Sequence, residues 1–339
     1  MDGGMSYQAA GVDIDKGERI VDAIKQSVSQ THTAKVLSPI GGFAGLYDLK
    51  SLLEDYQHPV MVQSIDGVGT KSIVARMAND YRFLGADLVS ATVNDILVCG
   101  ATPLTLLDYV ASDRLNSEAI ITLISSIAQS CQQYQISLVG GETAEMPDTY
   151  QQQEIDVVGI VTGVVEKSEC SDGSKVKAGD VVLGIASSGL HTNGFSLARK
   201  VLFEHQKLDI DAYIDALDMT LAEALLAPHV NYLPHVNALK NIGIKPHAMA
   251  HITGGGLQSN LQRVLPAGFQ MKPIEHDLPK PAIFDLIQTY GQIETLEMQR
   301  AFNMGIGYCM VINSDDVDAV IRSIKAQTTQ TIAPIGVIQ

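Results

Sequence analysis

The sequence places acidic side chains where predicted strands end. Asp66 follows the apolar run 59–65, and Glu142 follows the run 136–139 and two glycines. Side chains at strand ends face the crevice in which α/β proteins bind ligands. A third acid, Asp95, lies in an otherwise apolar helical run, where an unpaired carboxylate costs several kcal/mol. Mg²⁺ prefers one or two carboxylates together with water and phosphates, so the three acids predict a Mg²⁺ site.

Asp66 also opens the stretch Asp66-Gly67-Val68-Gly69-Thr70-Lys71. Its two glycines let backbone N–H groups approach a phosphate closely, while Thr70 and Lys71 add a hydroxyl and a cation. The stretch is not a Walker A loop, which requires G-x-x-x-x-G-K-[ST]. Considered alone, it is equally well explained as a tight turn with a solvated lysine. Glu142 alone is likewise explained as a loop charge.

Two loops in the second half place polar groups before predicted helices. The loop Ser188–Gly194 carries hydroxyls, His191 and Asn193, which suits an anion, although an ordinary N-cap loop explains it as well. His251 comes just before Thr253-Gly254-Gly255-Gly256, and consecutive glycines cost chain entropy. We therefore expect a ligand, most simply a phosphate, to approach this backbone closely. A single loop histidine is more often structural than catalytic.

Composition limits the partners of such a site. The chain has 339 residues, 46% of them hydrophobic and 18% charged, and a formal net charge of −15. A chain this acidic repels nucleic acid and anionic membrane surfaces, so a phosphate ligand must be neutralised locally. No apolar run reaches the roughly 18 residues needed to span a membrane. The four cysteines form no C-x-x-C pair, which predicts reduced thiols in a cytoplasmic protein.

The elements that must position these residues are strands alternating with helices. Helical spacing of apolar residues predicts helices near 13–28, 71–79, 84–98 and 117–133. The apolar strand 156–165 lacks alternation, as expected for a strand covered on both faces. Polar composition at 166–180 predicts a boundary between two domains, 1–169 and 170–339. The predicted fold class is α/β with mixed α+β character, with a sheet-plus-helices N-terminal domain and a C-terminal α/β domain.

In order along the chain, these motifs resemble those of the phosphoribosylformylglycinamidine cyclo-ligases, the aminoimidazole ribonucleotide synthetases of purine biosynthesis. The stretches that carry the resemblance are 6–7, 11–15, 41–43, 66–71, 93–95, 107–109, 140–147, 187–194, 251–256 and 302–307. As an ordered set they are specific. The stretches Gly140–Pro147 and Phe302–Gly307 favour the cyclo-ligase over its relatives.

The resemblance implies a homodimer in which the N-terminal domains pair their sheets into a barrel. It implies that the N-terminal domain binds ATP near that interface and that the C-terminal domain binds the substrate phosphate. The implied reaction converts formylglycinamidine ribonucleotide and ATP to 5-aminoimidazole ribonucleotide, ADP and phosphate. ATP phosphorylates the formyl oxygen, and the amidine nitrogen then closes the ring. Mg²⁺ is implied as a cofactor, and K⁺ is commonly used.

The resemblance also implies residue roles by position. Asp66, Asp95 and Glu142 are implied metal ligands, and Asp66 and Asp95 are implied catalytic residues together with His191 and His251. The implied nucleotide contacts are Lys25, Gly42, Phe43, Gly67, Gly69, Thr70, Lys71, Asn94 and Glu142. The implied substrate contacts are Asn193, Gly194, Thr253, Gly254, Gly255 and Gly256.

Some positions depart from the family pattern, and two other interpretations stay open. Cys99, Thr102 and Asp148 stand where Gln, Glu and Gly are frequent, although none of them replaces a proposed metal ligand. One alternative is a related ATP-dependent enzyme such as thiamine monophosphate kinase. The other is a non-catalytic nucleotide-binding protein, which leaves the acids and the histidine loops unexplained.

Overall fold

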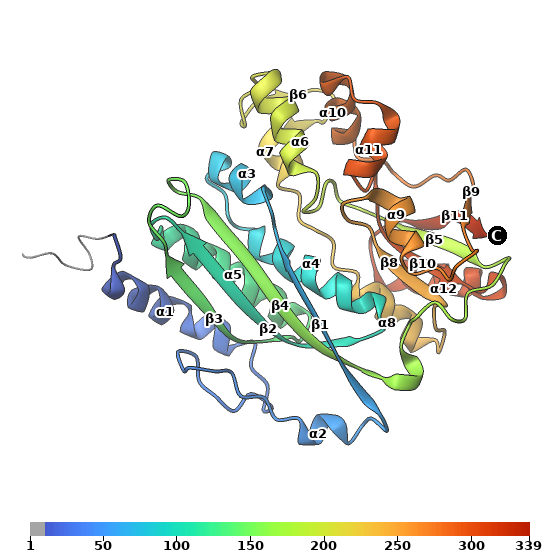
Figure 1. Cartoon of the computed structure of the whole chain (residues 1–339), viewed down its shortest axis with the longest axis horizontal. Helices are drawn as coiled ribbons and strands as arrows, with labels where there is room; N and C mark the ends of the chain where they lie inside the picture. Colours follow the sequence, from blue (N-terminus) through green and yellow to red (C-terminus); the bar gives the residue numbers. More distant parts are fainter. Residues whose placement is uncertain (1–10) are drawn as a thin grey trace, which may run out of the picture.

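Two main sheets, each with helices packed against it, and a small two-stranded sheet make up the described part of the chain (Figure 1). The computed structural model describes residues 11–339, so Ser6 and Tyr7 of the family resemblance lie outside the described residues. The predicted class, α/β with mixed character in two domains, is confirmed. Within residues 11–339, no helix combines the length and the apolar character that crossing a membrane requires.

The first sheet has four strands in the order β1-β4-β2-β3, and only β2 and β3 run parallel. Its strands are β1 (Pro59–Gly67), β2 (Thr102–Ser112), β3 (Ser137–Glu145) and β4 (Ile155–Glu166). Its helices are α1 (Ile14–Ser29), α2 (Lys50–Leu53), α3 (Lys71–Ala78), α4 (Leu84–Val98) and α5 (Ser117–Gln133). Helices α4 and α5 cover one face of the sheet, and α1 packs on α5 and β3 (Figure 1).

The other side of this sheet, which we call the open face, exposes apolar side chains. Met61 is 68% exposed, Ile65 65% and Leu107 39%. Ile65 and Leu107 both lie opposite Ile160 of β4, so they form a row across three strands. Burial also alternates along β4, so within a single chain the prediction that 156–165 is covered on both faces is wrong. A sheet built mainly from antiparallel pairs needs helices on only one face.

The second sheet has five antiparallel strands in the order β8-β10-β5-β11-β9. They are β5 (Val181–Ala186), β8 (Ala248–His251), β9 (Met271–Pro273), β10 (Ile306–Ile312) and β11 (Ile332–Ile338). Alternate residues of its strands enter two different cores. Met310 packs in the core that includes α8 (Leu233–Asn241) and α12 (Val317–Gln327), and Val311 packs in the core under α9 (Gly256–Gln262).

Shorter elements complete the second half. They are η1 (Lys167–Glu169), α6 (Phe195–Arg199), a π-helical turn η2 (Lys200–His205), β6 (Tyr213–Ile214), β7 (Met219–Thr220), α7 (Leu221–Leu225), α10 (Ile283–Gly291), α11 (Thr295–Ala301) and η3 (Ser314–Asp316).

Helix α4 connects the two domains. It packs on β1 and β4 of the first sheet and also on β8 and α8 of the second domain. A helix that is apolar on all sides is expected to be buried on all sides, and α4 is buried along most of its length. Three of its polar residues, Asp87, Asn94 and Asp95, lie at the junction of the domains, where each contacts the second domain.

Candidate active site at the domain junction

Two of the predicted acids meet at this junction. Asp66 is the penultimate residue of β1 and shares one face of that strand with Ser64, whose hydroxyl donates to Asp95 Oδ2 (3.1 Å). Burial raises the pKa of Asp66 above its ordinary value; the Gly67 N–H opposes this rise, and the charge of Asp95 adds to it. The side chain of Asp95 is 37% exposed, so solvent reaches the pair. Two half-buried carboxylates that repel each other form a place where a cation is stabilised.

The acid pair fits a Mg²⁺ ion that also binds phosphates. In the part of the chain that the structure describes, no three His, Cys, Asp or Glu side chains form a metal cluster. Mg²⁺ usually takes one or two carboxylates and completes its shell with water and substrate phosphates. Asp66 and Asp95 are thus sufficient as protein ligands for a nucleotide-bound ion.

Glu142, the third predicted ligand, lies at the other edge of the first sheet. Asp66 lies opposite Gly159 in β4. Gly159 lies opposite Asp108 in β2, which lies opposite Gly141 in β3. Three strand intervals, about 14 Å, therefore separate Asp66 from β3. Within one chain, Glu142 does not join the acid pair.

Glu142 also points to the opposite face from Asp66. Side chains alternate along a strand, and residues directly opposite each other in neighbouring strands share a face. Asp108 is buried on the helix side, and burial raises its pKa to about 7. Its neighbour Tyr109, which lies opposite Glu142, is therefore on the open face. Glu142 lies beside the exposed apolar row of that face.

Other predicted nucleotide contacts lie at the same edge of the sheet as Glu142. Lys25 is in α1, where it pairs with Asp22 (2.6 Å). Phe43 is fully exposed in the glycine-rich turn that follows α1. This segment lies against β3, because the His32 ring hydrogen-bonds to the Leu138 carbonyl (2.9 Å). We call Lys25, Gly42, Phe43 and Glu142 the β3-edge group, and Asp66, Gly67, Gly69, Thr70 and Asp95 the β1-edge group.

Lys71 has a different place from the one predicted. Its Nζ forms an ion pair with Asp87 Oδ2 (2.7 Å) and donates to the Ala227 carbonyl (2.8 Å), and both charged side chains are almost fully buried. Burial lowers the pKa of Lys71 and raises that of Asp87, while their mutual attraction opposes both shifts. Because no part of Lys71 reaches solvent, this geometry does not support a nucleotide contact. The lysine instead anchors the start of α3 to the second domain.

The side chain of Asn94 likewise has a structural role, because its amide hydrogen-bonds to backbone groups. Its Nδ2 donates to the Val230 carbonyl (2.9 Å), and its Oδ1 accepts from the Tyr232 N–H (2.8 Å). It is fully buried. A nucleotide contact by this amide is therefore not supported either, and Asn94 fixes the segment that follows α7 against α4.

Three histidines of the second domain form a buried cluster beside the acid pair. His251 Nδ1 is 2.8 Å from Asp95 Oδ1, and its Nε2 is 3.2 Å from His229 Nε2. The rings of His229 and His191 stack at a centroid distance of 4.0 Å. Burial holds the pKa of both stacked histidines well below its ordinary value, and nearby positive charge adds to this. The structure thus brings His191 and His251, which the resemblance implied separately, into one cluster, with His229 between them.

Sequence reasoning did not single out His229. Its segment carries no strand end, glycine run or motif spacing. Only the fold brings it to α4, where its backbone N–H donates to Asp87 Oδ1 (2.7 Å). The sequence indicates His191 because this residue lies in a polar loop before a predicted helix. Its backbone adopts a left-handed conformation with φ 59°. Such a conformation in a non-glycine residue often marks a functional site.

The glycine loop before α9, which was predicted to bind a phosphate, uses most of its backbone groups within the fold. The N–H groups of its glycines bond to Asn193 Oδ1, the Arg300 carbonyl and the Thr253 carbonyl, respectively. A Cβ on Gly256 would lie 1.7 Å from the Gln299 carbonyl oxygen, so α11 alone requires glycine there. Gly194 similarly leaves room for the Phe302 ring. Gly254 is the exposed glycine of the loop.

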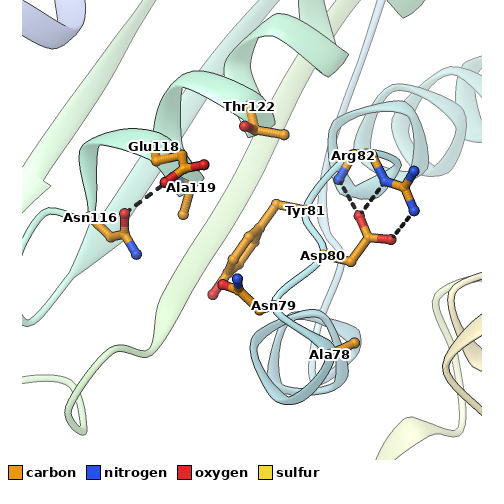
Figure 2. A pocket seen from close by; sticks show the side chains of 9 residues that line it. All are labelled: Ala78, Asn79, Asp80, Tyr81, Arg82, Asn116, Glu118, Ala119 and Thr122. Atoms are coloured by element: carbon orange, nitrogen blue, oxygen red, sulfur yellow. Dashed lines mark hydrogen bonds and ion pairs between the residues drawn. The ribbon is translucent and has the colours of Figure 1, made fainter. Parts of the chain in front are cut away.

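Figure 2 shows a surface pocket of about 480 Å³ that lies apart from these groups in the fold. It lies between the turn after α3 and the start of α5. Arg82 at its rim is held by Asp80 (2.6 Å), and Asn116 caps α5 through the Ala119 N–H. Its lining includes none of the residues that the sequence singled out.

The two main sheets, the connecting helix and the acid pair at the junction define a two-domain α/β protein with a candidate metal site between its domains. Residues 48–165 match the family model of the AIR synthase related protein N-terminal domain, and residues 177–339 match that of the C-terminal domain. The chain is 46% identical to phosphoribosylformylglycinamidine cyclo-ligase of Pseudothermotoga lettingae, covering 95% of this chain and 94% of that one. It is 44% identical to the enzyme of the same name from Thermoanaerobacter sp., again covering 95% of this chain and 94% of that one. The chain belongs to the phosphoribosylformylglycinamidine cyclo-ligase family.

Solved structures of other proteins share the fold. Escherichia coli HypE superposes with a TM-score of 0.66 at 17% identity, covering 95% of this chain and 90% of that chain. Thiamine-monophosphate kinase from Stenotrophomonas maltophilia gives a TM-score of 0.62 at 17% identity, covering 93% of each chain. At this identity the likeness concerns the fold alone.

Proposed function

We propose that this chain catalyses the ATP-dependent ring closure of formylglycinamidine ribonucleotide to 5-aminoimidazole ribonucleotide, releasing ADP and phosphate. The observation that carries the proposal is the Asp66–Asp95 pair, held at the domain junction against the histidine cluster. The near-full-length identity to curated cyclo-ligases supports the choice of reaction.

The β1-edge group is the proposed site for the nucleotide phosphates. Asp66 and Asp95 would hold Mg²⁺, which when bound neutralises charge on the transferring phosphoryl group. Gly69 is exposed and has a φ of 55°, so its backbone is open to a ligand. Thr70 contributes a hydroxyl that here lies 3.1 Å from Ser196 Oγ, across the domain junction. These groups position ATP between the domains.

The reaction itself needs no protein nucleophile. ATP transfers its γ-phosphoryl group to the formyl oxygen, and the amidine nitrogen attacks the activated carbon and expels phosphate. Holding two substrates in attacking geometry lowers the barrier of such a step by several kcal/mol. The chain contributes that geometry, together with local neutralisation of charge in a protein whose net charge is −15.

The second domain is the proposed site for the ribonucleotide. The exposed Gly254 is the accessible glycine of its loop, and its N–H donates to Asn193 Oδ1 of the neighbouring loop (3.2 Å). A substrate phosphate would replace that amide oxygen on the same N–H group. This placement is narrower than the four-residue loop expected from sequence, since the Gly255 and Gly256 N–H groups already have backbone partners.

We also propose a homodimer through the open face. Met61, Ile65 and Leu107 form an exposed apolar patch of the kind that marks interaction surfaces. A two-fold arrangement of two such sheets would bring the β3-edge group of one copy toward the β1-edge group of the other. Glu142 and Lys25 would then reach a nucleotide bound by the second copy.

The test is an ADP-release assay with purified chain, ATP and Mg²⁺. We expect release that depends on formylglycinamidine ribonucleotide and equals the aminoimidazole ribonucleotide formed. Parallel assays replace that substrate with thiamine monophosphate, and K⁺ with Na⁺ in the buffer. If the folded protein does not convert formylglycinamidine ribonucleotide but phosphorylates thiamine monophosphate, the proposed function is wrong and the chain is a thiamine monophosphate kinase.

A further inference from the structure

The ring of His251 is closed off from solvent in this structure. Its side chain is 2% exposed, its Nδ1 faces Asp95 Oδ1 (2.8 Å), and its Nε2 faces His229 Nε2 (3.2 Å). Neither ring nitrogen remains available to a substrate. The exposed end of this chain of contacts is the Asp95 carboxylate, which is 37% exposed.

The direction of the contact with Asp95 follows from its chemistry. An ionised carboxylate only accepts hydrogen bonds, so His251 Nδ1 donates to Oδ1. Ser64 Oγ donates to the other oxygen (3.1 Å). The carboxylate is thus held through both oxygens, and it stays partly exposed and close enough to Asp66 for the two charges to interact.

His229 fixes the far side of the His251 ring. It is 3% exposed and is held from several directions. Its backbone N–H donates to Asp87 Oδ1 (2.7 Å), its Nδ1 lies 3.4 Å from Thr192 Oγ1, and its ring stacks on His191. Because His229 is fixed in this way, it restricts the orientation of the neighbouring His251 ring.

We infer that His229 and His251 are positioning residues that orient the Asp95 carboxylate toward a nucleotide-bound divalent cation, and that neither exchanges a proton with the substrate. This differs from the catalytic role that the sequence predicted for His251. The inference rests on the proposed assignment of Asp95 to the metal site. Hydrogen-bond partners of metal ligands commonly contribute 10- to 100-fold to metal affinity or activity.

Two substitutions of His251 separate positioning from proton transfer. His251→Asn places an amide near the former Nδ1, where it still donates to Asp95, whereas His251→Gln places its amide near the former Nε2. An amide does not transfer protons at neutral pH. We therefore expect His251→Asn to keep kcat within about tenfold of wild type and His251→Gln to lose about 100-fold.

The same pair of substitutions at His229 tests the second link. His229→Gln keeps a polar atom facing His251, and His229→Asn keeps only the one that faces Thr192. Both lose the stacking on His191 equally, so a merely structural role would affect both alike. We expect His229→Asn to be at least tenfold weaker than His229→Gln in the binding measurement described next. His235→Asn, in another buried histidine that packs against Tyr232, is the matched control and should bind as wild type.

The binding measurement is independent of turnover. Calorimetry gives the dissociation constant of a non-hydrolysable ATP analogue with Mg²⁺ and again with EDTA. We expect His251→Gln and His229→Asn to weaken binding only when Mg²⁺ is present. A 100-fold or larger loss of kcat in His251→Asn, with unchanged Mg²⁺-dependent binding, would show proton transfer and overturn the inference, as would equal binding by both His229 variants. Failure of wild type to close the ring would refute the proposed function, while these binding comparisons would still decide the inference.

Discussion

Replacement of Lys71 by methionine is the most direct test of how the domain junction is held. The lysine and Asp87 form a buried ion pair with an N–O distance of 2.7 Å, and their side chains are 0% and 1% exposed. Methionine keeps most of the aliphatic volume but removes the charge and the donor to the Ala227 carbonyl. Asp87 then keeps the His229 N–H as its donor but has lost its counter-ion.

The expected cost comes from the charge left behind. Removing one partner of a buried ion pair typically destabilises a protein by about 3–5 kcal/mol, because the other charge remains without compensation. Asp87→Asn removes that charge, and its Oδ1 still accepts from the His229 N–H. The double variant Lys71→Met/Asp87→Asn should therefore regain at least half of the lost free energy of unfolding.

Urea denaturation of wild type, both single variants and the double variant gives the interaction free energy between the two residues. Binding of a non-hydrolysable ATP analogue is measured at low temperature, where the variants are folded. We expect a large loss of stability and nearly normal nucleotide affinity in Lys71→Met. A loss of stability below about 1 kcal/mol, combined with abolished nucleotide binding, would refute the buried-pair reasoning and restore the predicted nucleotide contact.

Three further predictions follow from the site, the histidines and the open face. Asp66→Asn should lower turnover at least 100-fold and weaken Mg²⁺-dependent nucleotide binding without loss of thermal stability; wild-type turnover would remove Asp66 from the metal site. Burial lowers the pKa of His235 to about 4, so the folded state resists its protonation while the unfolded state accepts a proton below about pH 6.5. Stability is thus lost as pH falls. Urea titrations of His235→Phe should show a slope between pH 6.5 and 4 that is shallower by about 1 kcal/mol per pH unit on average; identical slopes would contradict the shift. Ile65→Lys should give monomers in sedimentation velocity, whereas Leu296→Lys, at a 74% exposed position in the second domain, should not; equal behaviour of the two would argue against the open face as the interface.

Much of the local structure was predictable because it depends on periodicity. The helices expected near 13–28, 84–98 and 117–133 are confirmed as α1, α4 and α5 within about two residues at each end. The convergence of Asp66 and Asp95 was also predictable, since a strand end and an adjacent apolar helix each gave a reason for a buried acid. The position of Glu142 was not, because strand order in a sheet depends on long-range pairing that leaves no local pattern.

The glycine-rich and basic motifs were harder to interpret for a physical reason. A glycine indicates a close approach to the backbone but not the identity of the approaching group. At Gly256 that group is the Gln299 carbonyl of the chain itself. In the same way, the charge of Lys71 indicates an anionic partner, and the partner is Asp87, which only the packing of α3 against α4 brings within reach.

The separation of the β1-edge and β3-edge groups has a genetic consequence. If each active centre takes Asp66 from one copy and Glu142 from the other, two inactive variants can complement each other. In a mixed dimer of Asp66→Asn and Glu142→Gln chains, one centre receives both defects and the other receives neither. Random reassortment of equal amounts makes about half of the dimers mixed, so the mixture should regain about a quarter of wild-type activity. Two alleles that each abolish growth without purines would then support growth together.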